Sequence, residues 1–195
     1  TGTELRVTAH ARTEAEALAR ITPVVDQVKA LLGDKVIGVD VSCLEEVCYG
    51  LLKERGLTVG TAESCTGGLL AGALTSIPGS SQWFHQSFVT YSNQAKQDRL
   101  GVMPDTLLKH GAVSRETVYE MARGAKAVAQ ADYALSISGI AGPGGGSAAK
   151  PVGTVWFGLA TPEGSFEQTA LFTGDREAVR AQAVEYALTF LAEHL

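Results

Sequence analysis

Hydrophobic and polar positions along the chain predict an α/β protein. Short apolar runs bounded by turn residues predict strands at residues 57–61, 84–91, 133–138, 154–161 and 166–172. Apolar positions at helical spacing lie between and after these runs. Because strands and helices alternate over most of the length, we expect a three-layer α/β/α sandwich with a mixed sheet.

Capping residues predict where the helices begin and end. A Ser or Thr followed three residues later by Glu is a capping box, and Gly commonly ends a helix. One such helix begins at Ser42 and ends at Gly56. Four further helix starts are predicted, in order, at residue 69, Asn93, Ser114 and Asp175. Pro104 suits the first turn of one more short helix.

The first forty-two residues form a pattern of their own. Residues 5–9 alternate apolar and polar side chains, and residues 36–39 are apolar again, which predicts two strands. Between them a helix is expected from the capping box at Thr13 to Gly33, with Pro23 kinking or splitting it. One helix and two strands are too few for an independent fold. We therefore expect a partial α+β module at residues 1–42 before the main domain at residues 43–195.

Composition and charge narrow the functional classes. The net charge of −5 disfavours a general nucleic-acid binder, and no apolar run approaches the roughly 20 residues that cross a bilayer. The sequence shows no signal-peptide pattern at its start. Because it begins with Thr1 rather than Met, we expect it to be a fragment of a longer protein. The three cysteines show no metal-ligand spacing, so we expect reduced thiols, a cytoplasmic location and no metal site.

Residues 62–68 are the most informative stretch. A predicted strand passes through Ser64, Cys65 and Thr66 to a glycine pair, Gly67 and Gly68, and then into a helix. The first amides of a helix lack partners and its dipole is positive there, so this turn can hold an anion, an oxyanion or a nucleophile. Local sequence leaves Ser64 open as a helix cap or a nucleophile. It leaves Cys65 open as a second nucleophile or a packing residue.

A serine nucleophile needs a base, and the candidates are few. Among the four histidines only His85 and His110 could complete a Ser-His-Asp arrangement. Lys96 is an alternative, because the predicted strand at 84–91 leads directly into its helix. If that strand end lies beside the 62–68 turn, a desolvated Lys96 could deprotonate Ser64 with Tyr91 relaying or positioning the proton. A solvated surface lysine is the simpler interpretation of Lys96.

A second glycine-rich loop follows the predicted strand at 133–138. It runs from Gly139 through Ala141 and Gly142 to Gly146 and does not match a P-loop. It is either a flexible surface loop or one wall of a ligand crevice shared with the first turn. Arg176, at the start of the last helix, is either a surface charge or a phosphate ligand.

Five segments together resemble the successive signature blocks of one family, the CinA C-terminal domain or nicotinamide-mononucleotide deamidase (PncC) family. They are Ala62-Glu-Ser-Cys-Thr-Gly-Gly68, Val89-Thr-Tyr-Ser-Asn-Gln-Ala-Lys96 with Leu100-Gly-Val102, Gly111-Ala-Val-Ser114, Ser138-Gly-Ile-Ala-Gly-Pro143 and Lys150-Pro-Val-Gly-Thr-Val155. The resemblance runs from about residue 44 to the end. Residues 1–42 resemble the tail of the KH-like linker of full-length CinA proteins.

The resemblance implies hydrolysis of the carboxamide of nicotinamide mononucleotide to nicotinate mononucleotide and ammonia, in pyridine nucleotide salvage. It implies no cofactor, a small-molecule nucleotide as partner and self-association into a homo-oligomer. Ser64 would be the nucleophile, Lys96 the base and Tyr91 a supporting residue. The remaining expected site residues would bind substrate: Cys65, Thr66, Gly67, Gly68, Gly139, Ala141, Gly142 and Arg176. Two alternatives stay open, an amidohydrolase of another small amide and a non-catalytic interaction module of a competence- or DNA-damage-associated protein.

Overall fold

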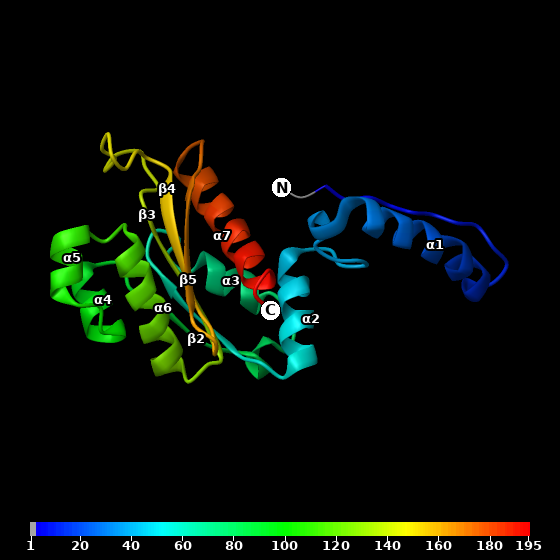
Figure 1. Ribbon diagram of the computed structural model, residues 1–195, viewed down its shortest axis with the longest axis horizontal. Coiled ribbons are helices and arrows are strands. Elements are labelled where there is room, and N and C mark those ends of the chain that lie inside the picture. The colour runs from blue at the N-terminus through cyan, green and yellow to red at the C-terminus, as the bar shows by residue number, and fades with distance from the viewer. Residues whose placement is uncertain (1–2) are drawn as a thin grey trace. The chain divides into compact units, whose positions relative to one another are not determined.

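The computed structural model describes residues 3–195, which divide into two compact units between Ser42 and Cys43. Among the described residues, no helix is both long and apolar enough to cross a lipid bilayer. The larger unit carries all of the expected site residues and is a mixed five-stranded sheet with helices on both faces (Figure 1). The predicted α/β class with a mixed sheet is therefore confirmed.

The smaller unit contains one helix, α1 (Glu14–Leu32), followed by the 3-10 turn η1 (Gly33–Lys35). Thr13 and Gly33 cap α1 as predicted. The sequence predicts a kink or a split at Pro23, and the split is wrong because α1 continues unbroken through Pro23. The predicted strands at residues 5–9 and 36–39 are also wrong, since the described part of this unit holds no strand. Residues 3–42 therefore hold a helix and a 3-10 turn without the predicted strands, and the assignment of this segment to a KH-like module stays a prediction.

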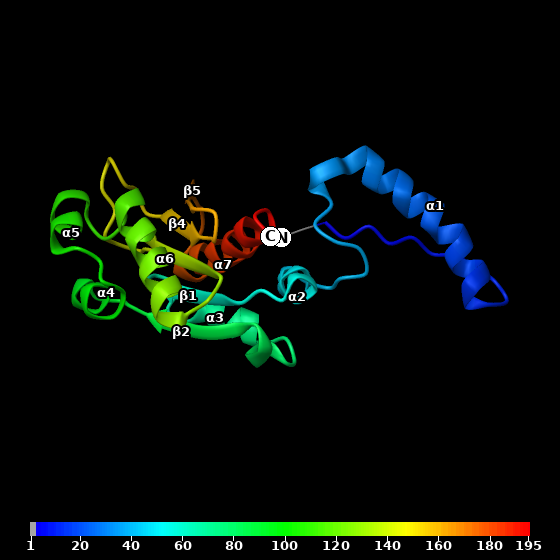
Figure 2. The same cartoon turned by 60° about the horizontal axis from the view of Figure 1, so that its bottom comes forward.

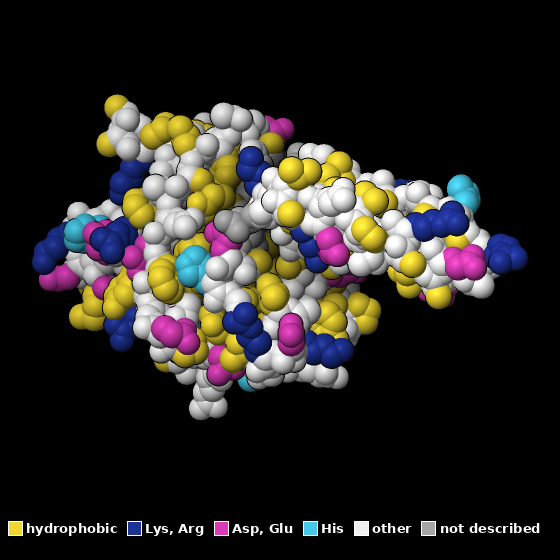
Figure 3. Space-filling model, turned by 45° about the vertical axis from the view of Figure 1, so that its right-hand side comes forward, with side chains coloured by type: hydrophobic (Ala, Val, Ile, Leu, Met, Phe, Trp, Pro, Cys, Tyr) yellow, Lys and Arg dark blue, Asp and Glu magenta, His cyan; other side chains and the backbone are white. Residues whose placement is uncertain are grey.

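The missing strands have a physical reason. An isolated extended segment has no ladder partner, and the side chain of Leu5 is 61% exposed. No side chain of α1 is buried, and Leu18, Val24 and Leu31 are exposed. Figure 3 shows hydrophobic side chains open to solvent along this helix. The alternating pattern of residues 5–9 therefore reflects apolar side chains without a core to bury them.

The sheet of the larger unit has the strand order β2-β1-β3-β4-β5. Strands β2 and β3 both run parallel to β1, whereas β4 and β5 are antiparallel additions that form the predicted hairpin. The bounds are β1 Val59–Glu63, β2 Phe84–Val89, β3 Tyr133–Gly139, β4 Thr154–Ala160 and β5 Ser165–Leu171. The chain leaves β1 toward β2 and returns on the other side of β1 at β3, which makes the carboxyl end of β1 a topological switch point.

Helices cover both faces of this sheet (Figures 1 and 2). One face packs on α6, with α4 and α5 outside it, and the other on α7 with α2 and α3. The bounds are α2 Leu44–Arg55, α3 Leu69–Thr75, α4 Asn93–Leu100, α5 Pro104–His110, α6 Arg115–Ala129 and α7 Arg176–Ala192, with the 3-10 turn η2 at Ser80–Gln82. The side chains of each strand alternate between the two apolar layers.

Most predicted helix boundaries are confirmed, and two caps are corrected. Ser114 and Asp175 cap α6 and α7 through their side-chain oxygens. Helix α4 is capped by Ser92, whose hydroxyl accepts from the Ala95 amide, and not by Asn93. The N-cap position of α2 is Cys43 rather than Ser42. In both helices the extended backbone of the true N-cap residue places the boundary one residue away from the predicted cap.

Candidate active site

The site begins at the carboxyl end of β1, where the chain turns into α3. The strand extends to Glu63, two residues beyond the predicted end, so the turn starts at Ser64. The Ser64 amide donates to Ile137 O of β3 at 2.9 Å, and the Thr90 amide after β2 donates to Glu63 O at 2.9 Å. Gly67 and Gly68 have φ values of 61° and 100°, which favour glycine. The neighbouring strands on both sides thus hold the start of the turn rigidly.

Glu63 is a site residue that the sequence analysis missed. Its buried carboxylate accepts hydrogen bonds from the amides of Gly68 at 2.9 Å, Leu70 at 3.1 Å and Ala71 at 2.8 Å. These are the first amides of α3, so a side chain from the strand caps the helix. The expectation that this helix start is open to an external anion is therefore wrong. This role depends on the end of β1 lying close to the start of α3, so no local helix-cap pattern in the sequence predicts it.

Glu63→Ala is expected to lower the free energy of unfolding by about 3 kcal/mol, because it leaves buried amides without an acceptor. Urea denaturation measures the change. The matched control is Glu120→Ala, since that carboxylate also caps a helix start through the Met103 amide, at 2.8 Å, but at an exposed contact where water can replace it. Equal losses in the two variants would contradict the buried-cap account.

Lys96 meets Ser64 across the turn. The Lys96 side chain is 0% exposed, and its Nζ lies 3.0 Å from Ser64 Oγ. The same nitrogen donates to Thr90 O at 2.8 Å and to Tyr91 O at 3.4 Å. Among the described residues no salt bridge joins Lys96 to a carboxylate. Sequence reasoning left Lys96 open as a surface residue, and the structure instead buries it against the serine.

Burial lowers the pKa of Lys96 to about 8, because a desolvated ammonium loses its hydration without gaining a carboxylate partner. The neutral amine fits the same surroundings. In the structure Nζ donates to Ser64 Oγ as an ammonium does. A neutral amine could keep two N–H groups for the carbonyls of Thr90 and Tyr91 and turn its lone pair toward the Ser64 hydroxyl. The two carbonyls therefore hold Lys96 Nζ within hydrogen-bonding distance of Ser64 Oγ.

A close helix contact fixes α4, which carries Lys96. Gly124 of α6 faces the end of α4, and a Cβ at that position would lie 2.0 Å from Leu100 O. Ala62, Leu100 and Met121 belong to one apolar cluster beneath the contact. The backbones of α4 and α6 can approach this closely only with glycine at position 124. This packing sets the height of Lys96 above the sheet.

The side chain of Tyr91 does not join the pair. Its hydroxyl accepts from Arg176 Nη2 at 3.0 Å, and the residue is 61% exposed. Only its backbone carbonyl reaches Lys96. Arg176 also donates to Gly142 O at 2.9 Å, so it links the strand end at Tyr91 to the glycine-rich loop. The structure thus brings Tyr91, Arg176 and Gly142 together at the rim, but no hydrogen bond places the phenol in a proton relay.

Cys65 is held as a packing residue. It is buried, and burial raises the pKa of its thiol to about 11, which keeps the sulfur neutral. All three cysteines are free thiols. Arg180 Nε donates to Cys65 O at 3.1 Å and Arg180 Nη2 to Thr66 O at 2.8 Å. Arg180 therefore anchors the turn from α7, a role that sequence analysis did not assign.

The amides of the turn differ in what they can offer. The Gly67 amide donates to Ser64 O at 3.2 Å and the Gly68 amide to Glu63, so neither is open to a ligand. The amides of Cys65 and Thr66 have no acceptor among the hydrogen bonds of the described residues. The Thr66 hydroxyl is buried and likewise lacks a partner there. The donors left for a developing negative charge near Ser64 are thus those of residues 65 and 66.

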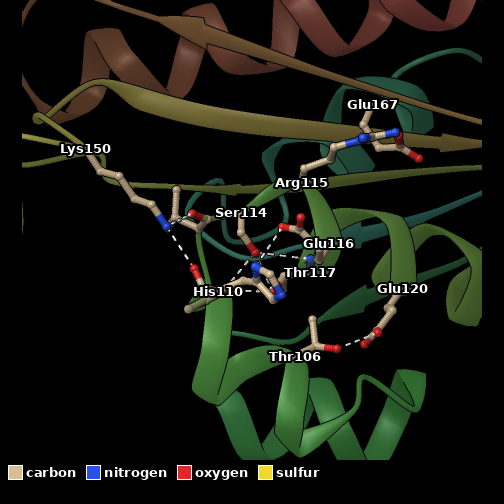
Figure 4. Close-up of polar contacts among 11 residues, drawn as sticks. Thr106, His110, Ser114, Arg115, Glu116, Thr117, Glu120, Lys150 and Glu167 are labelled. Carbon is tan, nitrogen blue, oxygen red and sulfur yellow. Dashed lines mark hydrogen bonds and ion pairs between the residues drawn. The ribbon is translucent and has the colours of Figure 1, made fainter.

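Neither candidate histidine reaches Ser64. His85 Nδ1 lies 3.4 Å from Ala129 O near the start of β2, and His110 Nδ1 lies 3.5 Å from Glu116. Figure 4 shows His110 beside the first turn of α6. Among the hydrogen bonds of the described residues neither histidine pairs with Ser64, and Lys96 is the base candidate that contacts the serine.

The glycine-rich loop approaches the same edge of the sheet. Gly139 ends β3, and a Cβ there would lie 2.9 Å from Thr154 O. Ala141 is buried, and the loop closes where the Gly153 amide donates to Ile140 O at 2.7 Å. Of the expected substrate-binding residues in this loop, Gly142 contacts Arg176 and Ala141 belongs to the apolar core.

A buried Ser-Lys pair at the switch point of a mixed sheet is an arrangement that fits a serine-dependent hydrolase. The chain belongs to the CinA C-terminal domain family, whose model matches residues 41–195. The predicted family is thereby confirmed.

Individual relatives sharpen this family assignment. The chain is 60% identical over 149 residues to the nicotinamide-nucleotide amidohydrolase PncC of Escherichia coli (strain K12), covering 76% of this chain and 90% of that protein. It is 44% identical over 191 residues to a putative competence-damage inducible protein of Caldanaerobacter subterraneus, covering 98% of this chain and 46% of that protein. A crystal structure of a CinA superfamily protein from Klebsiella pneumoniae superposes with a TM-score of 0.75 at 44% identity, covering 77% of this chain and 94% of that one.

Proposed function

We propose that the chain hydrolyses the carboxamide of nicotinamide mononucleotide to nicotinate mononucleotide and ammonia, with Ser64 as nucleophile and Lys96 as general base. The observation that carries the proposal is the 3.0 Å contact between Lys96 Nζ and Ser64 Oγ, made by a lysine that is wholly buried. The 60% identity to a nicotinamide-nucleotide amidohydrolase supports the choice of substrate.

In the first half of the reaction, neutral Lys96 takes the proton of the Ser64 hydroxyl as Oγ attacks the carboxamide carbon. The carbonyl electron pair moves onto oxygen, where the free amides of Cys65 and Thr66 can stabilise it. As the C–N bond breaks, the Lys96 ammonium returns the proton to the leaving nitrogen. Ammonia departs, and Ser64 carries the nicotinate nucleotide as an ester.

In the second half, water replaces ammonia as the partner of Lys96. The neutral amine accepts a proton from water while the water oxygen attacks the ester carbonyl. When the tetrahedral intermediate collapses, the bond to Oγ breaks and Ser64 recovers its proton from Lys96. The products are nicotinate mononucleotide and free enzyme. Lys96 accepts and returns the proton in both halves of the reaction.

The rim offers the cation that a nucleotide phosphate needs. Arg176 uses Nη1 and Nη2 toward Gly142 and Tyr91, and its guanidinium carries a permanent charge. Because Glu63 occupies the start of α3, the phosphate must bind away from that helix end. We therefore assign the phosphate to the Arg176 side of the site, with the exposed ring of Tyr91 next to it.

The pH dependence tests the role of Lys96. Since the base must be neutral, kcat/KM for nicotinamide mononucleotide should rise with pH and level off above an inflection near the Lys96 pKa of about 8. Ammonia release measured between about pH 6 and about pH 10 gives the profile. Tyr91→Phe should keep the same inflection, because its hydroxyl bonds Arg176 and not Lys96. A profile that falls through pH 8 would contradict a neutral lysine base.

Substrate choice is tested separately from chemistry. Ammonia release is compared for nicotinamide mononucleotide, free nicotinamide and a simple aliphatic amide. We expect the nucleotide to be strongly preferred, because Arg176 can contact only a substrate that carries the phosphate. A preference for the free amide would retain a Ser-Lys amidohydrolase but refute the nucleotide as substrate.

A further inference from the structure

Two of the signature segments play no part in the catalytic pair, and in the structure they meet. Residues 110–113, called here the 110–113 loop, comprise the last residue of α5 and the first three residues of its connection to α6. Lys150, which follows the glycine-rich loop in the chain, reaches this segment (Figure 4). Lys150 Nζ donates to His110 O at 2.9 Å and to Val113 O at 2.7 Å. One ammonium therefore ties the first and last carbonyls of the 110–113 loop.

Side chains also bind the carbonyls of the two middle residues, Gly111 and Ala112. Gly111 O accepts from the hydroxyls of Ser114 at 2.9 Å and Thr117 at 2.8 Å, and Ala112 O accepts from the hydroxyl of Ser138 at 2.6 Å. All four carbonyls of the loop are thus held by side-chain donors from three separate parts of the chain. Backbone loops at a surface usually leave such groups to water. This degree of fixation indicates that the loop conformation matters beyond connecting two helices.

The loop is hydrogen-bonded to the strand position beside Ser64. Glu63 pairs with Ile137 in the parallel ladder, so Ser64 and Ser138 follow at the same level on adjacent strands. Neighbouring strands are about 4.8 Å apart. Because Ser138 Oγ bonds Ala112 O, the loop is one hydrogen bond away from the strand position beside Ser64. The amides of Ala112 and Val113 have no acceptor among the described residues, and both residues are only half-buried.

Lys150 is itself held in place. The Ser147 amide donates to Lys150 O at 2.8 Å, and the Lys150 amide donates to the Ser147 hydroxyl at 3.1 Å. Among the described residues no salt bridge diverts its ammonium to a carboxylate. Lys150 therefore connects two loops, the glycine-rich loop and the 110–113 loop, that flank the carboxyl end of β3.

We infer that Lys150 is a positioning residue, which holds the 110–113 loop as the wall of the substrate site beside Ser64. This inference rests on the proposed function, since it assigns the wall to the nucleotide-binding side of that site. Lys150 does not touch the reacting atoms. Its loss should let the loop move away from β3 and weaken substrate binding, while the Ser64–Lys96 contact stays intact.

Lys150→Ala is expected to raise KM for nicotinamide mononucleotide by about tenfold or more and to lower kcat much less. The pH inflection of kcat/KM should stay where it is in the unaltered protein, because Lys96 is untouched. Lys150→Arg, which keeps a cation and several donors, should recover part of the lost affinity. Steady-state ammonia release measures all three. An unchanged KM in Lys150→Ala, or an equal loss in kcat with a displaced inflection, would overturn the inference.

Lys126→Ala is the matched control. Lys126 Nζ also donates to a backbone carbonyl, Thr161 O at 3.1 Å, but at the opposite end of α6. It should keep the KM of the unaltered protein, and a KM increase equal to that of Lys150→Ala would show a general effect of stability instead.

Hydrogen exchange supplies a readout that does not need turnover. Lys150→Ala should speed amide exchange in the peptide covering residues 108–116 and leave the peptide covering β1 unchanged. If the unaltered protein releases no ammonia from nicotinamide mononucleotide, the proposed function fails while the exchange result still decides whether Lys150 fixes the loop. Unchanged exchange in residues 108–116 would overturn the inference whatever the activity.

Discussion

Replacing Ser64 with alanine is expected to lower kcat for nicotinamide mononucleotide by at least about 10³-fold, because the nucleophilic oxygen is removed. The side chain is nearly buried, and alanine fits the space without moving the strand end, whose position is set by backbone bonds to Ile137 and Thr90. The variant should therefore fold and still bind the nucleotide. Ammonia release measures the loss, and titration calorimetry with the nucleotide measures the retained affinity.

The control for Ser64→Ala is Ser136→Ala. Ser136 is also a buried serine at a strand of the same sheet, and its hydroxyl donates to Val118 O at 2.6 Å, away from Lys96. Its loss should reduce stability without changing kcat. Turnover by Ser64→Ala at the rate of the unaltered protein would refute Ser64 as nucleophile.

Replacing Lys96 with methionine should lower kcat by about 10²–10⁴-fold, the usual contribution of a positioned general base. Methionine keeps most of the buried volume but has no lone pair for the Ser64 proton. Lys96→Arg is the comparison that separates charge from basicity, because arginine stays protonated and cannot act as the base. Both variants should be inactive at pH 7 in the ammonia-release assay. An active Lys96→Arg would show that a positive charge, and not a base, is needed.

The same buried amine predicts a stability effect. In the unfolded chain Lys96 titrates near the ordinary pKa of 10.5, and in the folded protein burial lowers the pKa to about 8. Between these values the unfolded state binds more protons, so the contribution of Lys96 to stability rises with pH through that window and its burial is unfavourable below pH 8. Lys96→Met should lack this rise. Urea denaturation at several pH values compares the two proteins.

Much of the fold is local enough to be predicted from sequence. The strand runs of the larger unit and the caps at Ser114 and Asp175 depend on residues close together in the chain, and the structure confirms them. The strand predictions for the smaller unit were wrong, because a strand needs a second strand to pair with as well as alternating apolar and polar residues. A period of two at residues 5–9 carries no information about whether a second strand is available.

In the candidate site, too, contacts between residues distant in the sequence could not be predicted from local sequence. The approach of Lys96 to Ser64 joins positions 32 residues apart, and only the family resemblance favoured it over a surface lysine. Glu63 was missed because its carboxylate acts on α3 only after β1 has formed. The phenol of Tyr91 was expected beside Lys96, but the carbonyl of that residue makes the contact. Sequence spacing brings a residue to a strand end, but it does not say which of its atoms faces the site.

The central claim is that Ser64 forms an ester with the nicotinate nucleotide. Trapping this acyl intermediate is the most direct test of it. Turnover of nicotinamide mononucleotide in the presence of hydroxylamine gives a second acceptor after ammonia has left. The account predicts that the nicotinohydroxamate nucleotide appears alongside nicotinate mononucleotide, in a ratio set by hydroxylamine concentration, and that Ser64→Ala forms neither. Nicotinate mononucleotide as the sole product at every hydroxylamine concentration, or hydroxamate formation by Ser64→Ala at an undiminished rate, would contradict it.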